Sequence, residues 1–147
     1  MGPDWVLDWV LIWAGTISLL RAVGHALVNE DAESDARVKK AQGAWWDRLK
    51  ATKPDPSIFW EFIERDRNLL LKGAELTVEP SATVFISGGA TPVHAPRPPP
   101  PPPPIYNYKM KSGRFAGQDP RDLVRDAIEW WEKQLDDIEQ AAAASSP

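Results

Sequence analysis

The stretch Pro56–Gly73 constrains the fold of this chain more than any other. Asp55 followed by Pro56 is typical of a helix start, with an N-cap carboxylate before a proline at the first helical position. Gly73 is typical of the left-handed residue that ends a helix. On a helical wheel, one side of this stretch is apolar and contains Ile58, Phe59, Phe62, Ile63, Leu69 and Leu70. The sequence therefore predicts an amphipathic helix packed against a core.

Residues 4–28 predict a first helix that is apolar nearly all round in its first half. A membrane-spanning helix requires about 20 apolar residues, and Asp8 and Arg21 bracket a shorter run. Acidic residues near the start also disfavour a signal peptide, which requires positive charge there. We therefore expect a buried helix of a soluble, cytoplasmic protein. Membrane insertion through residues 5–20 is the alternative.

The rest of the chain predicts two more helices and a small β element. Residues 32–51 predict a helix whose inner face holds Val38, Trp45, Trp46 and Leu49. Residues 76–87 are rich in β-branched side chains and predict either one strand or a hairpin turning at Pro80. We expect residues 83–87 to pair with a strand at 105–111. Asp119 followed by Pro120 predicts the start of a last helix.

Together these elements predict a single, mainly α domain over residues 1–147, a four-helix bundle with a small inserted β element and a proline-rich loop. The predicted parts are a helical core at 4–73, a β element at 74–118 that includes the proline-rich loop at 96–104, a C-terminal amphipathic helix at 119–140 and a frayed tail at 141–147. In that last helix we expect Val124, Ala127, Ile128, Trp131, Leu135 and Ile138 to be buried, and Glu129 to pair with Lys133.

Composition excludes several classes of site. The chain has no cysteine, so it has no thiolate nucleophile, disulfide or cysteine-based zinc site. Its two histidines, His25 and His94, are far apart in the sequence, and we expect no metal and no cofactor. A net charge of −4 gives no general attraction to nucleic acid. Basic residues nevertheless outnumber acidic ones over residues 35–72, and acidic ones dominate the last helix.

The stretch Phe62–Gly73 resembles the signature helix of HEPN-type domains, and the resemblance extends over about residues 4–73. Arg67 and Asn68 match the start of the motif, and Lys72 stands where its shortest form has a histidine. The resemblance implies a small helical bundle, commonly dimeric, of the kind found among bacterial ribonuclease toxins and defence proteins. It also implies that Arg67, Asn68 and Lys72 are the candidate catalytic residues.

The lysine at position 72 changes the expected chemistry. Cleavage through an RNA 2′-hydroxyl needs a group that exchanges a proton near neutral pH, as histidine does and an ordinary lysine does not. Five residues also separate Arg67 and Lys72 by about 140° on an ideal helix. We therefore expect phosphate binding without efficient catalysis. In the simplest alternative, these two cations are solvated or stabilise the helix locally.

Asp66 lies at the centre of the apolar side of the same helix. A carboxylate placed there must be paired or have a strongly shifted pKa. Arg21 and His25, four residues apart on the first helix, are the expected partners. The pair is predicted to fix helix packing, and the alternative is that Asp66 orients His25 as a base.

A second basic group contains Arg65, Lys109, Lys111 and Arg114, three of them interleaved with aromatic residues as in single-strand nucleic-acid binders. A strand with one core face and one solvated basic face gives the same pattern. The unbroken run Pro98–Pro104 predicts a polyproline II spacer or a ligand for an aromatic groove.

Three functions follow from these features. The first is a HEPN-like protein of a bacterial defence or toxin–antitoxin system that binds RNA or a protein partner without efficient catalysis. The second is an active, metal-independent ribonuclease that uses Arg67, Asn68 and Lys72, with His25 as a further member of the site. The third is a structural or assembly protein that uses the tryptophan-rich first helix and the proline run. A homodimer is expected for the first two.

Overall fold

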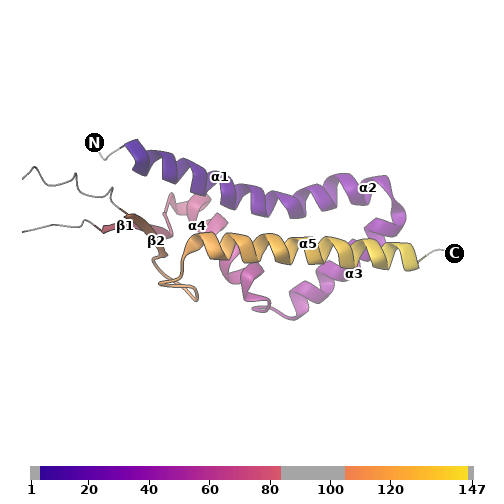
Figure 1. Ribbon diagram of the computed structural model, residues 1–147. Coiled ribbons are helices and arrows are strands. Elements are labelled where there is room, and N and C mark those ends of the chain that lie inside the picture. Colours follow the sequence, from indigo (N-terminus) through magenta and orange to yellow (C-terminus); the bar gives the residue numbers. More distant parts are fainter. Residues whose placement is uncertain (1–3, 84–104, 146–147) are drawn as a thin grey trace, which may run out of the picture.

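The computed structural model describes residues 4–83 and 105–145, and these residues are mainly helical (Figure 1). The three long helices are α1 (Asp4–Ala26), α3 (Ala36–Ala51) and α5 (Pro120–Ala144). Shorter segments are the π-helices η1 (Leu27–Asp31) and η2 (Ile58–Glu64), with α2 (Ala32–Ser34) and α4 (Arg65–Gly73). Strands β1 (Val78–Thr83) and β2 (Ile105–Met110) form an antiparallel pair. The predicted proline-rich loop at 96–104 lies outside the described residues.

Helices α1 and α5 run in the same direction across the molecule, and α3 runs back against them (Figure 1). The two-stranded sheet and α4 lie at the end where α1 and α5 begin (Figure 1). Helix α5 packs against α3, η2 and α1, so it is the element around which the others gather.

The core between these helices is unusually aromatic. Phe62 packs between Trp13 of α1 and Phe115, with ring centroids 6.1 and 6.2 Å away. Phe59 contacts Trp131 of α5 at 6.0 Å. Each such side chain contributes about 1.5–3 kcal/mol by leaving water. The buried core also includes Ile17, Leu20, Trp45, Leu49, Ile63, Val78, Met110, Leu123, Ala127 and Ile138.

Helix α1 is buried on one side only. Trp13, Ile17 and Leu20 are buried as an inner stripe. The opposite side exposes Leu7, Leu11, Ile12 and Leu19 at 63%, 63%, 61% and 71%. Elements of the same chain therefore leave this side of the apolar first half uncovered, because α4, η2 and α5 all pack on the other one. Among the described residues, the helical stretch Leu7–Ser34 meets the length and hydropathy of a membrane span by composition alone.

The predicted central helix consists of two consecutive helical segments. Its first part, η2, has π-helical hydrogen bonding, and its second part is α4. The Pro56 carbonyl accepts hydrogen bonds from the backbone N–H groups of Phe59 (3.1 Å) and Trp60 (3.3 Å), and the π-helical segment begins at Ile58. The left-handed residue is Ala74 (φ 49°), not Gly73 as predicted. Backbone donation from Ala74 to the Leu70 carbonyl (3.1 Å) closes the last turn one residue later than the glycine suggested.

The predicted helix at 32–51 is broken at Asp35. This residue is extended (φ −140°, ψ 119°), and its side chain accepts a hydrogen bond from the Arg37 backbone N–H at 2.8 Å. Asp35 is therefore the N-cap of α3. An aspartate is more favourable at an N-cap than inside a helix, so the chain breaks here instead of continuing the preceding helix. The inner residues Trp45 and Leu49 are buried as predicted.

The predicted strand at 105–111 is confirmed over Ile105–Met110, and it pairs antiparallel with β1. Val78 pairs with Met110 and Thr83 with Ile105, so the pairing extends five residues before the predicted segment 83–87. Pro80 lies inside β1 opposite Tyr108, which rules out the hairpin turning there. Tyr108 stacks on Trp9 of α1 with centroids 3.8 Å apart, and this contact fixes the sheet on the helices. Residues 84–87 fall outside the described part of the chain.

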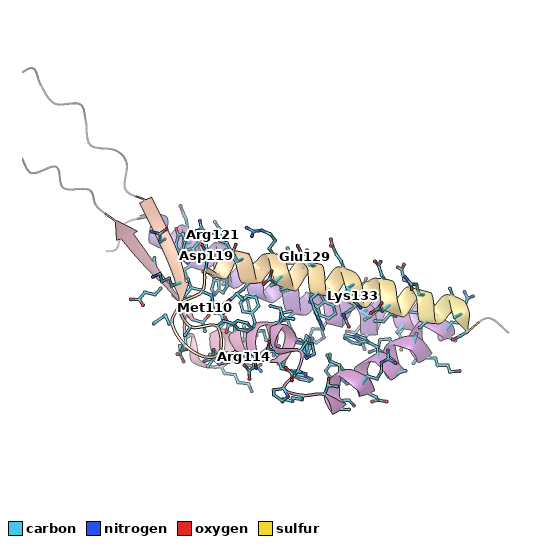
Figure 2. The ribbon with its side chains drawn as sticks, turned by 60° about the horizontal axis from the view of Figure 1, so that its bottom comes forward. Met110, Arg114, Asp119, Arg121, Glu129 and Lys133 are labelled. Atoms are coloured by element: carbon cyan, nitrogen blue, oxygen red, sulfur yellow. The ribbon has the colours of Figure 1, made fainter. Side chains whose placement is uncertain are left out.

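The start of α5 is confirmed. Asp119 accepts the Arg121 backbone N–H at 2.8 Å, and both residues lie where the chain enters the helix from the sheet (Figure 2). The helix continues to Ala144 with Ala142 buried. The prediction of a frayed tail is therefore wrong for residues 141–144.

Two side-chain predictions for α5 are wrong. Ile128 is 47% exposed, and Leu123 takes its place in the core because the buried stripe follows an i, i+4 spacing. Lys133 contacts Asp137 at 2.8 Å instead of pairing with Glu129 (Figure 2).

Candidate functional site

Arg67 and Asn68 are held on α4 by a short chain of hydrogen bonds. The Arg67 guanidinium donates to Asn68 Oδ1 at 3.1 Å, and Asn68 Nδ2 donates to Glu64 Oε1 at 3.4 Å. Both residues are half-buried, so neither side chain is free to turn fully into solvent. The interactions orient Arg67 without neutralising it.

Glu64 also joins this group to helix α1. Its Oε2 accepts a hydrogen bond from Arg21 Nε at 2.7 Å, with 20% and 27% of the two side chains exposed. Arg67, Arg21 and His25 line one hollow of about 160 Å³ together with Ser18, Ala22 and Leu71. The structure therefore brings together four predicted site residues from two helices. With two arginines against one glutamate, the hollow favours an anion.

Lys72 does not line this hollow. It is exposed in the last turn of α4, and it forms no hydrogen bond or ion pair with any residue of the described ranges. The structure therefore does not bring the predicted set of Arg67, Asn68 and Lys72 together, as their helical separation anticipates.

Asp66 is buried as predicted, at 1% exposure, but its predicted partners are wrong. Its Oδ2 accepts a hydrogen bond from Thr77 Oγ1 at 2.8 Å, and Arg65 Nη1 lies 3.6 Å from its Oδ1. Burial raises the pKa of Asp66 to about 6, against the opposing effects of Thr77 and Arg65. Arg21 pairs instead with Glu64, which lies nearer to α1, so Asp66 does not orient His25.

Arg65 holds the loop after β2 onto α4. Its Nη2 donates to Ser112 Oγ at 3.1 Å and its Nη1 to the Ser112 carbonyl at 3.5 Å. Gly113, with φ at +83°, lies directly against the guanidinium, because a Cβ there would be 2.6 Å from Nη1. These contacts give Arg65 a structural part and leave it outside the hollow that contains Arg67.

The remaining basic candidates lie on the sheet and its loop. Lys109, Lys111 and Arg114 are exposed, and Arg114 Nε lies 4.0 Å from Glu61 Oε2 (Figure 2). Tyr108 packs on α1 and Met110 is 3% exposed, so β2 has one core face and one basic face. This is the arrangement that the simpler interpretation predicted.

The sequence interpretation missed a larger cavity beside the hollow. It has a volume of about 380 Å³, and its lining residues are Arg21, Gly24, His25, Val28, Gln42, Trp45, Trp46, Phe59 and Trp131. The available signal was Gln42, a polar residue three positions before Trp45 on the inner face of α3. Arg21 and His25 line both the cavity and the hollow, so the two spaces share one edge.

No group of three or more acidic residues and histidines within the described residues is placed to hold a metal ion. Comparisons of the chain with protein-family models, curated proteins and solved structures found no match. Function must therefore be argued from the geometry of the hollow, the cavity and the exposed surface.

Proposed function

We propose that this chain is a cytoplasmic HEPN-like protein of a bacterial defence or toxin–antitoxin system, a four-helix bundle of α1, α3, η2–α4 and α5. It binds RNA phosphate through Arg67 and does not cleave RNA efficiently. The supporting observation is the hollow that Arg67 lines together with Arg21 and His25. Asn68 accepts a hydrogen bond from Arg67, and Glu64 accepts hydrogen bonds from Asn68 and Arg21. Arginine forks match phosphate oxygens in geometry and charge.

The case against efficient cleavage is chemical. Transfer of the 2′-hydroxyl proton needs a base near the phosphate, and within the hollow only His25 is of a suitable type. Lys72 stands outside it, so an active ribonuclease would need this lysine from a second copy of the chain. RNA bound by Arg67 would therefore be held without the second proton-transfer group that rapid cleavage requires.

The test is RNA binding and cleavage by the purified full chain at low and moderate salt. Arg67→Ala should weaken RNA binding about tenfold. It should also reduce the slope of log affinity against log salt concentration by about one, because one phosphate contact is lost. Arg48→Ala is the matched control, because Arg48 is an exposed arginine on α3 whose side chain forms no hydrogen bond or ion pair with the described residues. Equal binding by wild type and Arg67→Ala would exclude the proposal. Cleavage lost in Arg67→Ala would establish the ribonuclease alternative instead.

A protein partner, most simply a second copy, is a second candidate supported by a separate observation. Leu7, Leu11, Ile12 and Leu19 are exposed on the side of α1 away from the core, and large exposed apolar patches mark association sites. Sedimentation equilibrium should show a homodimer that Leu11→Gln dissociates and Leu71→Gln, on α4, does not. Solubility that depends on detergent would indicate membrane insertion of α1 instead. If RNA binding and self-association are both absent, the structural or assembly alternative becomes the leading one.

A further inference from the structure

We infer that the tryptophan-lined cavity is a binding site for a small planar aromatic acid. The cavity lies between α1, α3, η2 and α5, and its volume of about 380 Å³ is in the range of small-molecule sites. Such sites combine apolar walls with a few polar groups that fix the ligand's orientation. Both parts can be identified here from named side chains.

Two tryptophans in the walls have their indole N–H groups already paired. Trp45 Nε1 donates to Gln134 Oε1 at 2.9 Å, and Trp131 Nε1 donates to the Leu20 carbonyl at 2.8 Å. The two indole rings therefore offer carbon surface to the cavity instead of N–H donors. Trp45 and Trp131 are 5.9 Å apart between centroids, and Phe59 and Trp46 line the same space. Ring surfaces of this kind favour a planar aromatic ligand.

Gln42 supplies an unused polar group inside the cavity. Its side chain is only 9% exposed, yet it forms no hydrogen bond with any described residue. Its amide atoms are not sealed from solvent, because Asp66 Oδ1 is the only described side-chain atom both sealed and unpaired. Gln42 is among the residues that line the cavity. Its amide N–H group can therefore donate a hydrogen bond to an acceptor on a ligand that displaces solvent there.

Arg21 supplies the positive charge at the edge of the same space. Its Nε is bound to Glu64, and its two terminal nitrogens have no hydrogen-bond partner among residues 4–83 and 105–145. Nη1 lies 3.1 Å from where a Cβ on Gly24 would be, and the Trp131 ring lies 3.2 Å from that point. The Arg21 guanidinium and the Trp131 indole therefore both lie close to Gly24, which has no side chain to separate them. Two free N–H groups in a plane match the two oxygens of a carboxylate.

The ligand class follows from this pairing of surfaces. One or two fused rings would lie against the aromatic walls, with the carboxylate toward Arg21 and Gln42 and the His25 imidazole at the same edge. The site shares Arg21 and His25 with the hollow of the proposed RNA binding, but Arg67 lines only the hollow, and Gln42 and Trp46 line only the cavity. Substitutions at these three residues therefore separate the two functions.

The experiment is calorimetric titration of the full chain with 2-naphthoate and with its neutral counterpart 2-naphthamide. The acid should bind at one site at least about tenfold more tightly than the amide, because a charge-assisted hydrogen bond is stronger than a neutral one. Gln42→Leu and Arg21→Gln should each weaken acid binding by about tenfold, and Arg21→Gln should leave amide binding nearly unchanged.

Two controls separate the site from general hydrophobic binding and from the RNA proposal. Trp46→Ala should abolish acid binding, whereas Trp60→Ala should not, because Trp60 is an equally half-buried neighbour that does not line the cavity. Arg67→Ala should keep acid binding. The proposal is overturned if neither probe binds, if acid and amide bind equally, or if Gln42→Leu and Arg21→Gln both bind the acid like wild type. Tighter binding of adenosine 5′-monophosphate than of the acid would replace the assigned ligand class.

Discussion

Replacing Asp66 with asparagine tests whether ionisation of this buried carboxyl lowers the free energy of unfolding. Burial raises the pKa of Asp66 from 3.8 in the free side chain to about 6 in the folded chain. Between these values the folded chain keeps a proton that the unfolded chain has lost. The stability associated with the protonated carboxyl is therefore present below about pH 4 and is lost as the pH rises through about 6.

The size of the effect follows from the same two pKa values. Moving a pKa from 3.8 to about 6 costs the folded state about 3 kcal/mol at neutral pH, at 1.36 kcal/mol per pH unit. Asparagine does not ionise, so the stability of Asp66→Asn relative to wild type should increase by about 2.5 kcal/mol from pH 4 to pH 7.5, the rest of the change lying below pH 4. The buried amide adds an unpaired donor at a cost of about 1–3 kcal/mol, but that cost is independent of pH.

The assay is urea denaturation of both chains at about pH 4, 5, 6 and 7.5 and constant ionic strength, with the free energy of unfolding compared at each pH. Other carboxylates cancel in the difference between the two chains. Asp136→Asn is the control, because Asp136 is exposed on α5 and unpaired among the described residues. The difference in unfolding free energy between this variant and wild type should not change with pH. If the Asp66→Asn difference also stays constant to within about 0.5 kcal/mol, the argument from burial is refuted.

Two further substitutions test the backbone. Ala74→Gly should stabilise the chain by about 1 kcal/mol, because Ala74 has φ 49° and glycine adopts this conformation without a Cβ penalty; thermal unfolding measures it, and a lower melting temperature would contradict the assignment. Gly113→Ala should cost about 1 kcal/mol more than Gly117→Ala, although both glycines have φ +83°, because only at Gly113 would the Cβ displace Arg65 from Ser112. Equal losses in denaturant unfolding would show that the Arg65 contact contributes nothing.

Sequence reasoning predicted best what depends on neighbouring residues. The start of α5 follows from Asp119 and Pro120 alone, since both the cap and the proline act within one turn. The burial of Asp66 followed from its place on the apolar side of a helix. Its partner did not, because Thr77 lies eleven residues later, beyond the helix end, where no helical spacing relates the two.

Features set by tertiary packing were not predictable. Leu7 and Leu19 could not be assigned to the exposed side of α1, because a helix apolar all round gives no signal about which side its neighbours cover. For the site, the four-residue spacing of Arg21 and His25 predicted that they share a face. That this face meets Arg67 depends on how α1 crosses α4, and the cavity depends on four elements at once.

The π-helical hydrogen bonding of η2 has a consequence for the face that α4 presents. A π-turn accommodates an extra residue relative to an α-turn, and each residue of an α-helix advances the chain by about 100° around the axis. Because the π-turn absorbs one extra residue, deleting a residue within Ile58–Glu64 would restore ordinary α-helical spacing there and leave Arg67 on the side that faces His25. The same deletion just before Arg67, in the regular α-helix α4, would turn Arg67 away from that side by about 100°. Segment η2 is thus the part of this helix in which the chain can change length without changing the face that α4 presents.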